Sequence, residues 1–290
     1  MNNLAIWMRL IGLSAAWGMA FLFIRIAVPA LGPIWLVEMR VLIAGCFLLA
    51  WIMYHGQHLR LRQHAMLYLK LGALNSAFPF MLVAWGEIEL TASLSAVLIA
   101  TTPLFTAVLV SSQSGRPLGW ARAAGLILGL CGVIVLTGGV VTLAVTPNHL
   151  FAVLALLAAA LCYALAAIYT ARMSQGIPPL HLATGSQFGA ALILAALLPW
   201  AQTPLVPNVA VVLAVFALAM FSSAAAFLLY FHLIQEAGSV ATTTVNFLSP
   251  LFGVIGGHLW LNEALTPGML FGAALVLGGS YLVLRRPRFG

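Results

Sequence analysis

Long apolar stretches constrain this chain more than any other feature. A helix that crosses a bilayer needs about 20 consecutive, mostly apolar residues, and ten such stretches follow one another along the 290 residues. Only 6% of the residues are charged, whereas a soluble domain carries about 25%. The predicted spans are residues 5–27, 33–54, 65–86, 91–111, 121–142, 149–171, 179–201, 208–234, 239–261 and 267–284. We therefore predict an all-α membrane protein with ten transmembrane helices.

The second half of the chain repeats features of the first. The tripeptide Pro103-Leu104-Phe105 recurs 147 residues later as Pro250-Leu251-Phe252. The same offset relates Glu89 to Glu236, Gly125 to Gly272 and Gly132 to Gly279, and an offset of 146 relates Pro33 to Pro179. Each half then holds five spans, and because five is odd, the second half enters the membrane from the other side. We predict an inverted repeat of two five-helix halves, residues 1–145 and 146–290, as in many secondary transporters.

Both copies of the tripeptide place a proline inside an apolar span. Proline removes one backbone donor, so the carbonyls of Ile99 and Asn246 lose their usual partners, and in a membrane these need substitutes. Polar residues of the candidate substrate site stand just before the two breaks: Thr101, Thr243 and Asn246. One such proline commonly only kinks a helix, but a matched pair in two halves favours a transport site. We predict gating hinges at Pro103 and Pro250.

Most basic residues fall on one side of the predicted spans. Ten of the twelve Lys and Arg residues lie in segments on the side of both termini, and cytoplasmic segments carry the excess of such residues. We expect a multi-pass protein of a bacterial-type inner membrane with both termini cytoplasmic. The net charge of +7 is then a topology signal, and we expect no nucleic-acid partner.

The predicted second span contains two charged residues, Glu38 and Arg40. Charges within hydrocarbon are costly and are therefore candidates for function. Arg40 would attract a carboxylate, and Glu38 is a candidate for proton coupling. The alternative is structural: Arg40 would hold the bundle together through backbone carbonyls, while Arg25 would pair with Glu38 or extend to the interface.

Aromatic and polar residues recur at helical spacing along several spans. Such spacing places residues on one helix face, where rings suit an apolar side chain and attract an ammonium group. With Arg40, these residues form the predicted substrate site: Trp17, Phe21, Asn75, Phe78, Trp85, Tyr163, Ser223 and Tyr230. Leu82 and Phe227 continue the stripes of the third and eighth spans. The alternative for any one aromatic is helix packing or an interfacial belt.

The residues that enzymes and metal sites need are scarce. The chain has no aspartate and only five glutamates, and its three cysteines form no CxxC pair. The seven histidines do not combine with acidic residues at metal-ligand spacing. We expect no metal site, no cofactor and no enzyme activity. An integral-membrane enzyme acting on lipid is the alternative of another class, and it would need a nucleophile–base pair or a metal cluster.

The order and spacing of these features resemble the drug/metabolite transporter superfamily, in its ten-helix branch with two EamA-type domains. The resemblance rests on Trp17-Gly18, Phe21, Arg25, Pro33 and Arg40, then on Pro103-Leu104-Phe105 with Gly125 and Gly132, and on Pro250-Leu251-Phe252 with Glu263, Gly272 and Gly279. It implies a central cavity between the halves and export of metabolites, commonly amino acids. One subgroup, the YddG-like proteins, exports aromatic amino acids. The counterpart of Trp17-Gly18 departs from the pattern, because it falls near Tyr163-Ala164 and lacks the tryptophan.

We therefore expect a secondary transporter that exports small metabolites by alternating access, above all amino acids, the aromatic and larger apolar ones included. A nucleotide sugar, a drug or another metabolite on the same fold is the alternative. The expected partners are a small-molecule substrate and membrane lipid. A monomer suffices for this function, and a dimer is the alternative.

Overall fold

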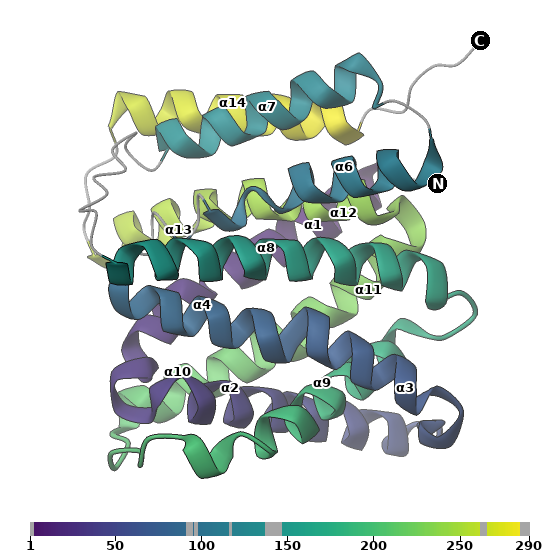
Figure 1. Cartoon of the computed structure of the whole chain (residues 1–290), viewed down its shortest axis with the longest axis vertical. Helices are drawn as coiled ribbons and strands as arrows, with labels where there is room; N and C mark the ends of the chain where they lie inside the picture. The colour runs from purple at the N-terminus through teal and green to yellow at the C-terminus, as the bar shows by residue number, and fades with distance from the viewer. Residues whose placement is uncertain are drawn as a thin grey trace.

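The chain folds as a bundle of helices that run along a common direction (Figure 1). The computed structural model describes residues 3–90, 95, 98–115, 118–136, 147–261 and 266–284, and these residues form helices and no strand. The helices are α1 (Asn3–Gly18), α2 (Ala20–Tyr54), α3 (Leu61–Gly72), α4 (Phe78–Glu89), α6 (Thr102–Ser114), α7 (Trp120–Leu136), α8 (Pro147–Met173), α9 (Pro179–Ala195), α10 (Val209–Ala219), α11 (Ala226–Ala237), α12 (Ser239–Thr243), α13 (Val245–Leu261) and α14 (Pro267–Leu284). A short 3-10 helix, η2, spans Leu198–Trp200.

Among the described residues, four helical segments are long and apolar enough to cross a membrane: Leu4–Tyr54, Leu61–Glu89, Pro147–Met173 and Val209–Ala237. Two shorter apolar helices, Trp120–Val135 and Leu270–Val283, accompany them. The first segment breaks at Gly32, whose φ of 70° and ψ of 165° are not helical. Glycine tolerates this positive φ because it has no Cβ. This break falls between the predicted spans 5–27 and 33–54, and the membrane-protein class follows from the lengths of the four segments.

Two segments of π-helix interrupt the long helices at matching places. The first, η1, spans Ala73–Ala77 between α3 and α4. The second, η3, spans Met220–Ala225 between α10 and α11. Their first residues are separated by the same 147 positions that relate the sequence repeats. A π-turn widens the helix, and such turns are frequent at functional sites.

Helices α7 and α14 cross at glycines that the repeat relates to one another. A Cβ on Gly125 would lie 2.8 Å from the carbonyl oxygen of Gly279, and one on Gly132 would lie 2.9 Å from that of Gly272. Gly272 and Gly279 are the counterparts of Gly125 and Gly132. Gly125 therefore contacts the counterpart of Gly132, and Gly132 contacts the counterpart of Gly125. This reciprocal pattern is that of a two-fold contact. The small residues allow the two backbones to approach closely.

The proline breaks differ between the halves. Pro103 lies in the first turn of α6, which begins at Thr102, whereas Pro250 lies inside α13. Thr102 Oγ1 donates to the carbonyl of Ile99 at 2.7 Å, so a hydroxyl supplies the substitute partner that this carbonyl was expected to need. Thr101 and Thr243 likewise direct their hydroxyls to backbone carbonyls, those of Leu98 and Val240.

Candidate functional site

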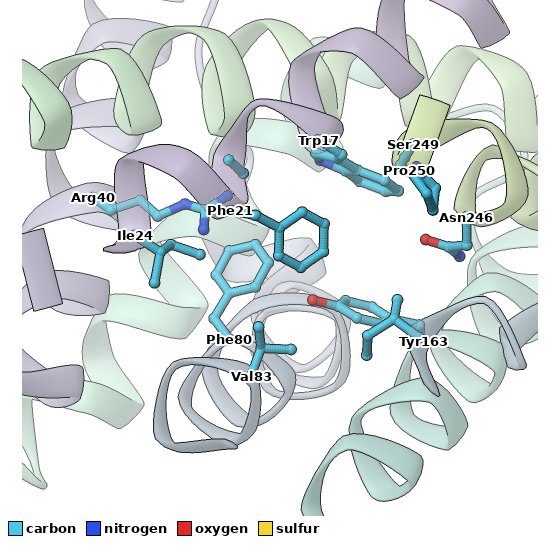
Figure 2. A pocket seen from close by; sticks show the side chains of 12 residues that line it. Trp17, Phe21, Ile24, Arg40, Phe80, Val83, Tyr163, Asn246, Ser249 and Pro250 are labelled. Atoms are coloured by element: carbon cyan, nitrogen blue, oxygen red, sulfur yellow. The ribbon is translucent and has the colours of Figure 1, made fainter. Parts of the chain in front are cut away.

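A small cavity lies between α1, α2, α4, α8 and α13, and Figure 2 shows its wall. The lining residues are Trp17, Ala20, Phe21, Ile24, Arg40, Phe80, Val83, Ile99, Tyr163, Asn246, Ser249 and Pro250. They come from both halves of the chain and are mostly aromatic or aliphatic. The cavity volume is about 60 Å³, which holds a few water molecules. Pockets for organic ligands measure about 300–1,000 Å³, so the cavity in this conformation is smaller than such pockets.

Arg40 supplies the positive charge of this wall. It is only 3% exposed, and its Nε donates to Ser223 Oγ at 2.7 Å while its Nη2 donates to the carbonyl of Ser222 at 3.0 Å. The guanidinium carbon lies 3.9 Å from the centre of the Phe80 ring, a cation–π contact. Nη1 has no hydrogen-bond partner among the described residues. Arg40 therefore connects α2 to η3 through two hydrogen bonds, one of them to a backbone carbonyl.

The π-helix η3 builds the support for Arg40. A π-turn closes its hydrogen bonds one residue later than an α-turn, and here the carbonyl of Ser222 accepts from Arg40. The hydroxyl of Ser222 donates to the carbonyl of Ala16 at 2.6 Å, which ties η3 to α1 beside Trp17. One widened turn thus connects α2, α11 and α1 around the cavity.

The aromatic wall consists of rings that the repeat relates in pairs. Trp17 and Tyr163, separated by 146 positions, have ring centroids 6.5 Å apart. Phe80 and Phe227, separated by 147 positions, have centroids 6.2 Å apart. Tyr230 extends the group, with its ring centroid 5.7 Å from that of Trp17. Counterparts therefore meet at the centre of the molecule, and the cavity lies where the two halves face each other.

The other end of the cavity is polar but uncharged. Asn246, Ser249 and Pro250 lie across from Arg40 in Figure 2, with the rings between them. Asn246 is 8% exposed, and the hydroxyl of Ser249 donates to the carbonyl of Val245 at 2.9 Å. The cavity thus offers a cation at one end and amide and hydroxyl groups at the other.

The structure brings together some of the residues that the sequence placed in the substrate site. Trp17, Phe21, Arg40, Tyr163, Asn246 and Pro250 line the cavity. Ser223 and Tyr230 lie directly behind its wall, in contact with Arg40 and Trp17. The remaining residues lie elsewhere: Asn75, Thr243 and Pro103 are buried away from the cavity lining, and Thr101 is partly buried.

Phe78 and Trp85 differ most from the expected inner face. They are 46% and 43% exposed and line a separate outer groove. The predicted stripe assumed an uninterrupted α-helix from Asn75 onward. The π-segment η1 inserts one extra residue, and one residue corresponds to a rotation of about 100° around the helix axis. The inner face of α4 therefore carries Phe80 and Val83 instead.

The predicted substrate site does not include Phe80, because the stripe predicted for the third span lies on another face of the helix. The repeat contains the signal that identifies it, since the 147-residue offset relates Phe80 to Phe227. Phe227 is fully buried and belongs to the eighth-span stripe that does face inward.

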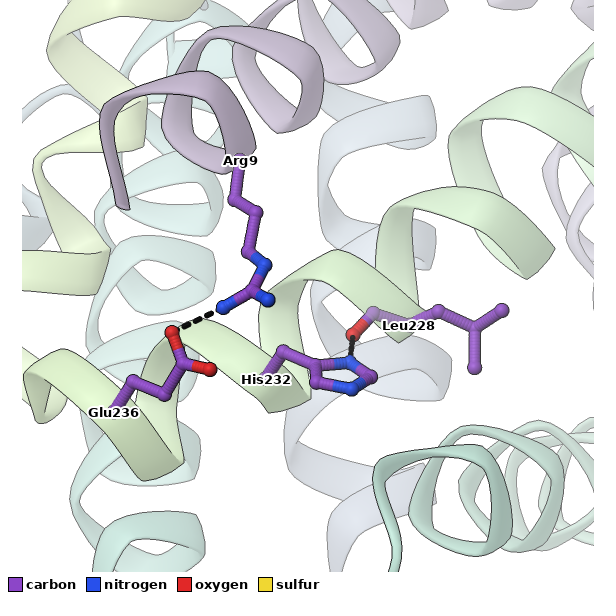
Figure 3. A network of polar contacts seen from close by, with 4 residues as sticks. All are labelled: Arg9, Leu228, His232 and Glu236. Atoms are coloured by element: carbon purple, nitrogen blue, oxygen red, sulfur yellow. Dashed lines mark hydrogen bonds and ion pairs between the residues drawn. The ribbon is translucent and has the colours of Figure 1, made fainter. Parts of the chain in front are cut away.

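Glu38 and Arg25 do not form the ion pair considered from the sequence. Glu38 is 4% exposed, and its Oε2 has no hydrogen-bond partner among the described residues. Arg25 is exposed, and the ion pair that the structure does record joins Arg9 of α1 to Glu236 of α11 (Figure 3). Beside this pair, His232 Nδ1 lies 2.7 Å from the carbonyl oxygen of Leu228. Within the described residues no group of three His, Cys, Asp or Glu could hold a metal ion.

Apolar helices long enough to cross a membrane pack around an interior cavity, which defines the class as a polytopic membrane protein. The model of the EamA-like transporter family matches residues 5–138 and again residues 150–285. The chain therefore belongs to the EamA-like transporter family and contains two EamA-like repeats. The resemblance to the drug/metabolite transporter superfamily is confirmed by this match.

Relatives with this organisation occur in bacteria and plants. The chain is 30% identical over 289 residues to a chloroplastic WAT1-related protein of Arabidopsis thaliana, covering 96% of this chain and 69% of that protein. It is 27% identical to the uncharacterized inner membrane transporter YedA of Escherichia coli, covering 96% and 92%. It is 26% identical to a probable terminal-alkyne amino-acid exporter of Streptantibioticus cattleyicolor, covering 97% and 94%. A crystal structure with 20% identity superposes with a TM-score of 0.78 over 94% of both chains, which supports the fold alone.

Proposed function

We propose that this transporter exports small metabolites, above all amino acids with aromatic or larger apolar side chains, by alternating access. The observation that carries the proposal is the placement of Arg40 at one end of an aromatic cavity that both halves line. A carboxylate pairs with a guanidinium through charge-assisted hydrogen bonds, and Nη1 is the nitrogen left for it. Rings of Trp17 and Tyr163 suit the side chain, and their faces attract an ammonium group.

The other end of the cavity completes this arrangement. The amide oxygen of Asn246 and the backbone around Pro250 accept hydrogen bonds from an ammonium group, which has three donors and no acceptor. A zwitterion then spans the cavity between a cation and a set of acceptors. The similarity to a probable amino-acid exporter supports the same substrate class.

The mechanism requires two halves that exchange exposure of one site. We propose ten transmembrane helices in two inverted halves, residues 1–145 and 146–290, with both termini cytoplasmic in a bacterial-type inner membrane. The paired π-helices, the reciprocal glycine contacts and the meeting of related rings support this symmetry. Pro103 and Pro250 act as hinges, and Glu38 is the candidate proton carrier.

A nucleotide-sugar transporter on the same fold is the competing solute class. A phosphate-bearing solute favours a polar site with several basic groups, whereas a single arginine lines this cavity among rings and aliphatic side chains. The cavity therefore favours a monoanionic or zwitterionic substrate with an apolar part.

Counterflow into proteoliposomes tests the proposal. Vesicles loaded with unlabelled phenylalanine, leucine, a nucleotide sugar or a cationic dye are diluted into the matching labelled solute, with and without a pH gradient. We expect uptake of the amino acids above protein-free vesicles, and a response to the gradient if Glu38 carries a proton. Exchange of the nucleotide sugar or the dye but of neither amino acid would overturn the substrate assignment.

A further inference from the structure

A second hollow of this protein lies outside the central cavity. It is a groove of about 750 Å³, lined by Leu31, Gly32, Pro33, Ile34, Trp35, Phe78, Met81, Leu82, Trp85, Ile88, Cys162, Trp200, Ala201 and Gln202. The lining comes from the turn at the start of the second predicted span, from α4, from the middle of α8, and from the last residue of η2 with the two residues that follow it. These parts meet at the end of the bundle opposite the two termini (Figure 1).

The groove has the depth of one membrane leaflet. Ile88 lies one residue before the end of α4, and Phe78 is its first residue. Ten residues of α-helix rise about 15 Å, which is half of the roughly 30 Å hydrocarbon core. Cys162 lies near the middle of α8, which runs from Pro147 to Met173. The groove therefore extends from one face of the membrane to its midplane.

The chemistry of the lining changes along this depth. The deep part carries Phe78, Leu82 and Cys162, and the shallow part carries Trp200 and Gln202. Tryptophan is typical of the membrane–water interface, and Gln202 supplies the amide at that end. This order, hydrocarbon at the midplane and indole and amide at the surface, matches the order of groups along a phospholipid.

An apolar hollow of this size does not stay empty or fill with water. Voids in a packed interior cost free energy in proportion to their volume, and water is retained only where polar partners hold it. The lining offers few such partners, whereas acyl chains surround it on the open side. We propose that the groove binds an acyl chain of a phospholipid from the leaflet opposite the termini.

The bound chain supports the wall of the transport cavity from behind. On α4, Phe80 and Val83 face the cavity, while Phe78 and Leu82 face the groove. On α8, Tyr163 faces the cavity and its neighbour Cys162 faces the groove. One layer of helix separates the two spaces, so the lipid fixes the position of the residues that would contact the substrate.

Photo-crosslinking with a lipid probe tests this site without relying on transport. The full-length protein is reconstituted in phosphatidylcholine vesicles that contain a phosphatidylcholine with a diazirine in the middle of one acyl chain. After irradiation, adducts are mapped by mass spectrometry before and after exchange into detergent. The reference surface is the outward face of α10, where Leu213 is 62% exposed and meets lipid without a groove.

We expect adducts on α4 and around Cys162 that persist in detergent, whereas adducts on α10 disappear. Leu82→Trp fills the groove and should lower the affinity for the lipid about tenfold. The yield of adducts on α4 and α8 should fall by the same factor. Leu213→Trp is the matched control and leaves them unchanged. If Leu82→Trp does not fold, a chain with Cys162 as its single cysteine, made by Cys46→Ala and Cys131→Ala, reports the site instead. Its labelling by a water-soluble maleimide in detergent then rises when bound lipid is removed.

Three results would overturn the proposal. Equal, detergent-sensitive adducts on α4 and α10 would mean that only the bulk bilayer touches the groove. Displacement of the probe by phenylalanine or by a dye would make the groove a path for transported solute. Crosslinks from Cys162 to a second copy of the chain would make it a subunit interface. Each result is read from adduct positions, so a failure of the amino-acid proposal leaves the test intact.

Discussion

Trp17 and Tyr163 stack on one another with an interplanar angle of 27°, and 146 positions separate them in the sequence. A residue near a pseudo-two-fold axis lies close to its own counterpart, so this contact locates the axis inside the cavity. The two related positions thus present different rings to the cavity, an indole from α1 and a phenol from α8.

This contact predicts that Tyr163 sets the size of substrate that the site accepts. Tyr163→Ala removes the ring, enlarges the cavity and deletes a stacking interaction of about 0.5–1.5 kcal/mol. We expect the KM for phenylalanine to rise several-fold while bulkier aromatic substrates are favoured in competition, as measured by counterflow. Tyr163→Phe is the matched control, because it keeps the ring. If Tyr163→Ala folds and shows an unaltered order of substrates, Tyr163 does not contact the substrate.

The hydrogen bonds of Arg40 predict a second set of effects. Ser223→Ala removes the acceptor of Nε, and a hydrogen bond to a charged group contributes about 1.5–3 kcal/mol. We expect kcat/KM for counterflow of amino acids to fall by about one to two decades. Arg40→Lys should lower it at least as far, because an ammonium does not reproduce the planar fork of the guanidinium. Arg62→Ala, at an exposed residue outside the cavity, is the control and should transport normally. If a folded Arg40→Lys protein transports at the full rate, the guanidinium does not bind the substrate.

The outcome for the site shows what periodicity can and cannot predict. Trp17 and Phe21 precede the break at Gly32, and Arg40 follows that break within regular helix, so none of the three lies beyond a π-segment. Phe78 and Trp85 follow η1, and a single inserted residue rotated them onto the outer face. Hydropathy does not reveal a π-turn, because the mean over a span is the same whether or not one turn holds an extra residue. Comparison of the halves does contain the information, since Phe80 matches the buried Phe227.

The fold was more predictable than the site for a related reason. The break at Gly32-Pro33 depends on a glycine that tolerates a positive φ and on a proline that has no backbone donor. Such residues mark backbone geometry directly in the sequence. The contacts of Arg40 with Ser222 and Ser223 depend instead on three-dimensional packing between helices more than 180 residues apart, which spacing along one helix does not encode.

The glycine crossing of α7 and α14 predicts a sharp contrast between two neighbouring positions. A Cβ on Gly279 would lie 2.5 Å from the backbone nitrogen of Gly129, whereas one on Gly278 would meet nothing closer than 3.7 Å. Gly279→Ala forces the helices apart, and overpacking of this kind costs about 1–3 kcal/mol. Gly278→Ala is the control and should be neutral or stabilising, because alanine favours the helix. Thermal unfolding in detergent measures both, and equal midpoints would show that the crossing tolerates separation.

The ion pair between Arg9 and Glu236 predicts that charge attraction helps to hold the helices together at the end of the bundle near the N-terminus. It joins α1 to α11, the same two helices that bring Trp17 and Tyr230 together deeper in the bundle. The side chains are 31% and 34% exposed, so the pair contributes about 0.2–1 kcal/mol and weakens as salt screens it.

Arg9→Glu places two carboxylates in contact and should shift the protein towards a state open at this end. A cysteine introduced at Ala16, in a chain free of its three native cysteines, should then react faster with a water-soluble maleimide. The double reversal, Arg9→Glu with Glu236→Arg, restores the attraction and should return the rate to that of the parent. Equal labelling of the three proteins at low salt would mean that other contacts hold this end closed, since the reversal restores charge pairing without restoring either native side chain.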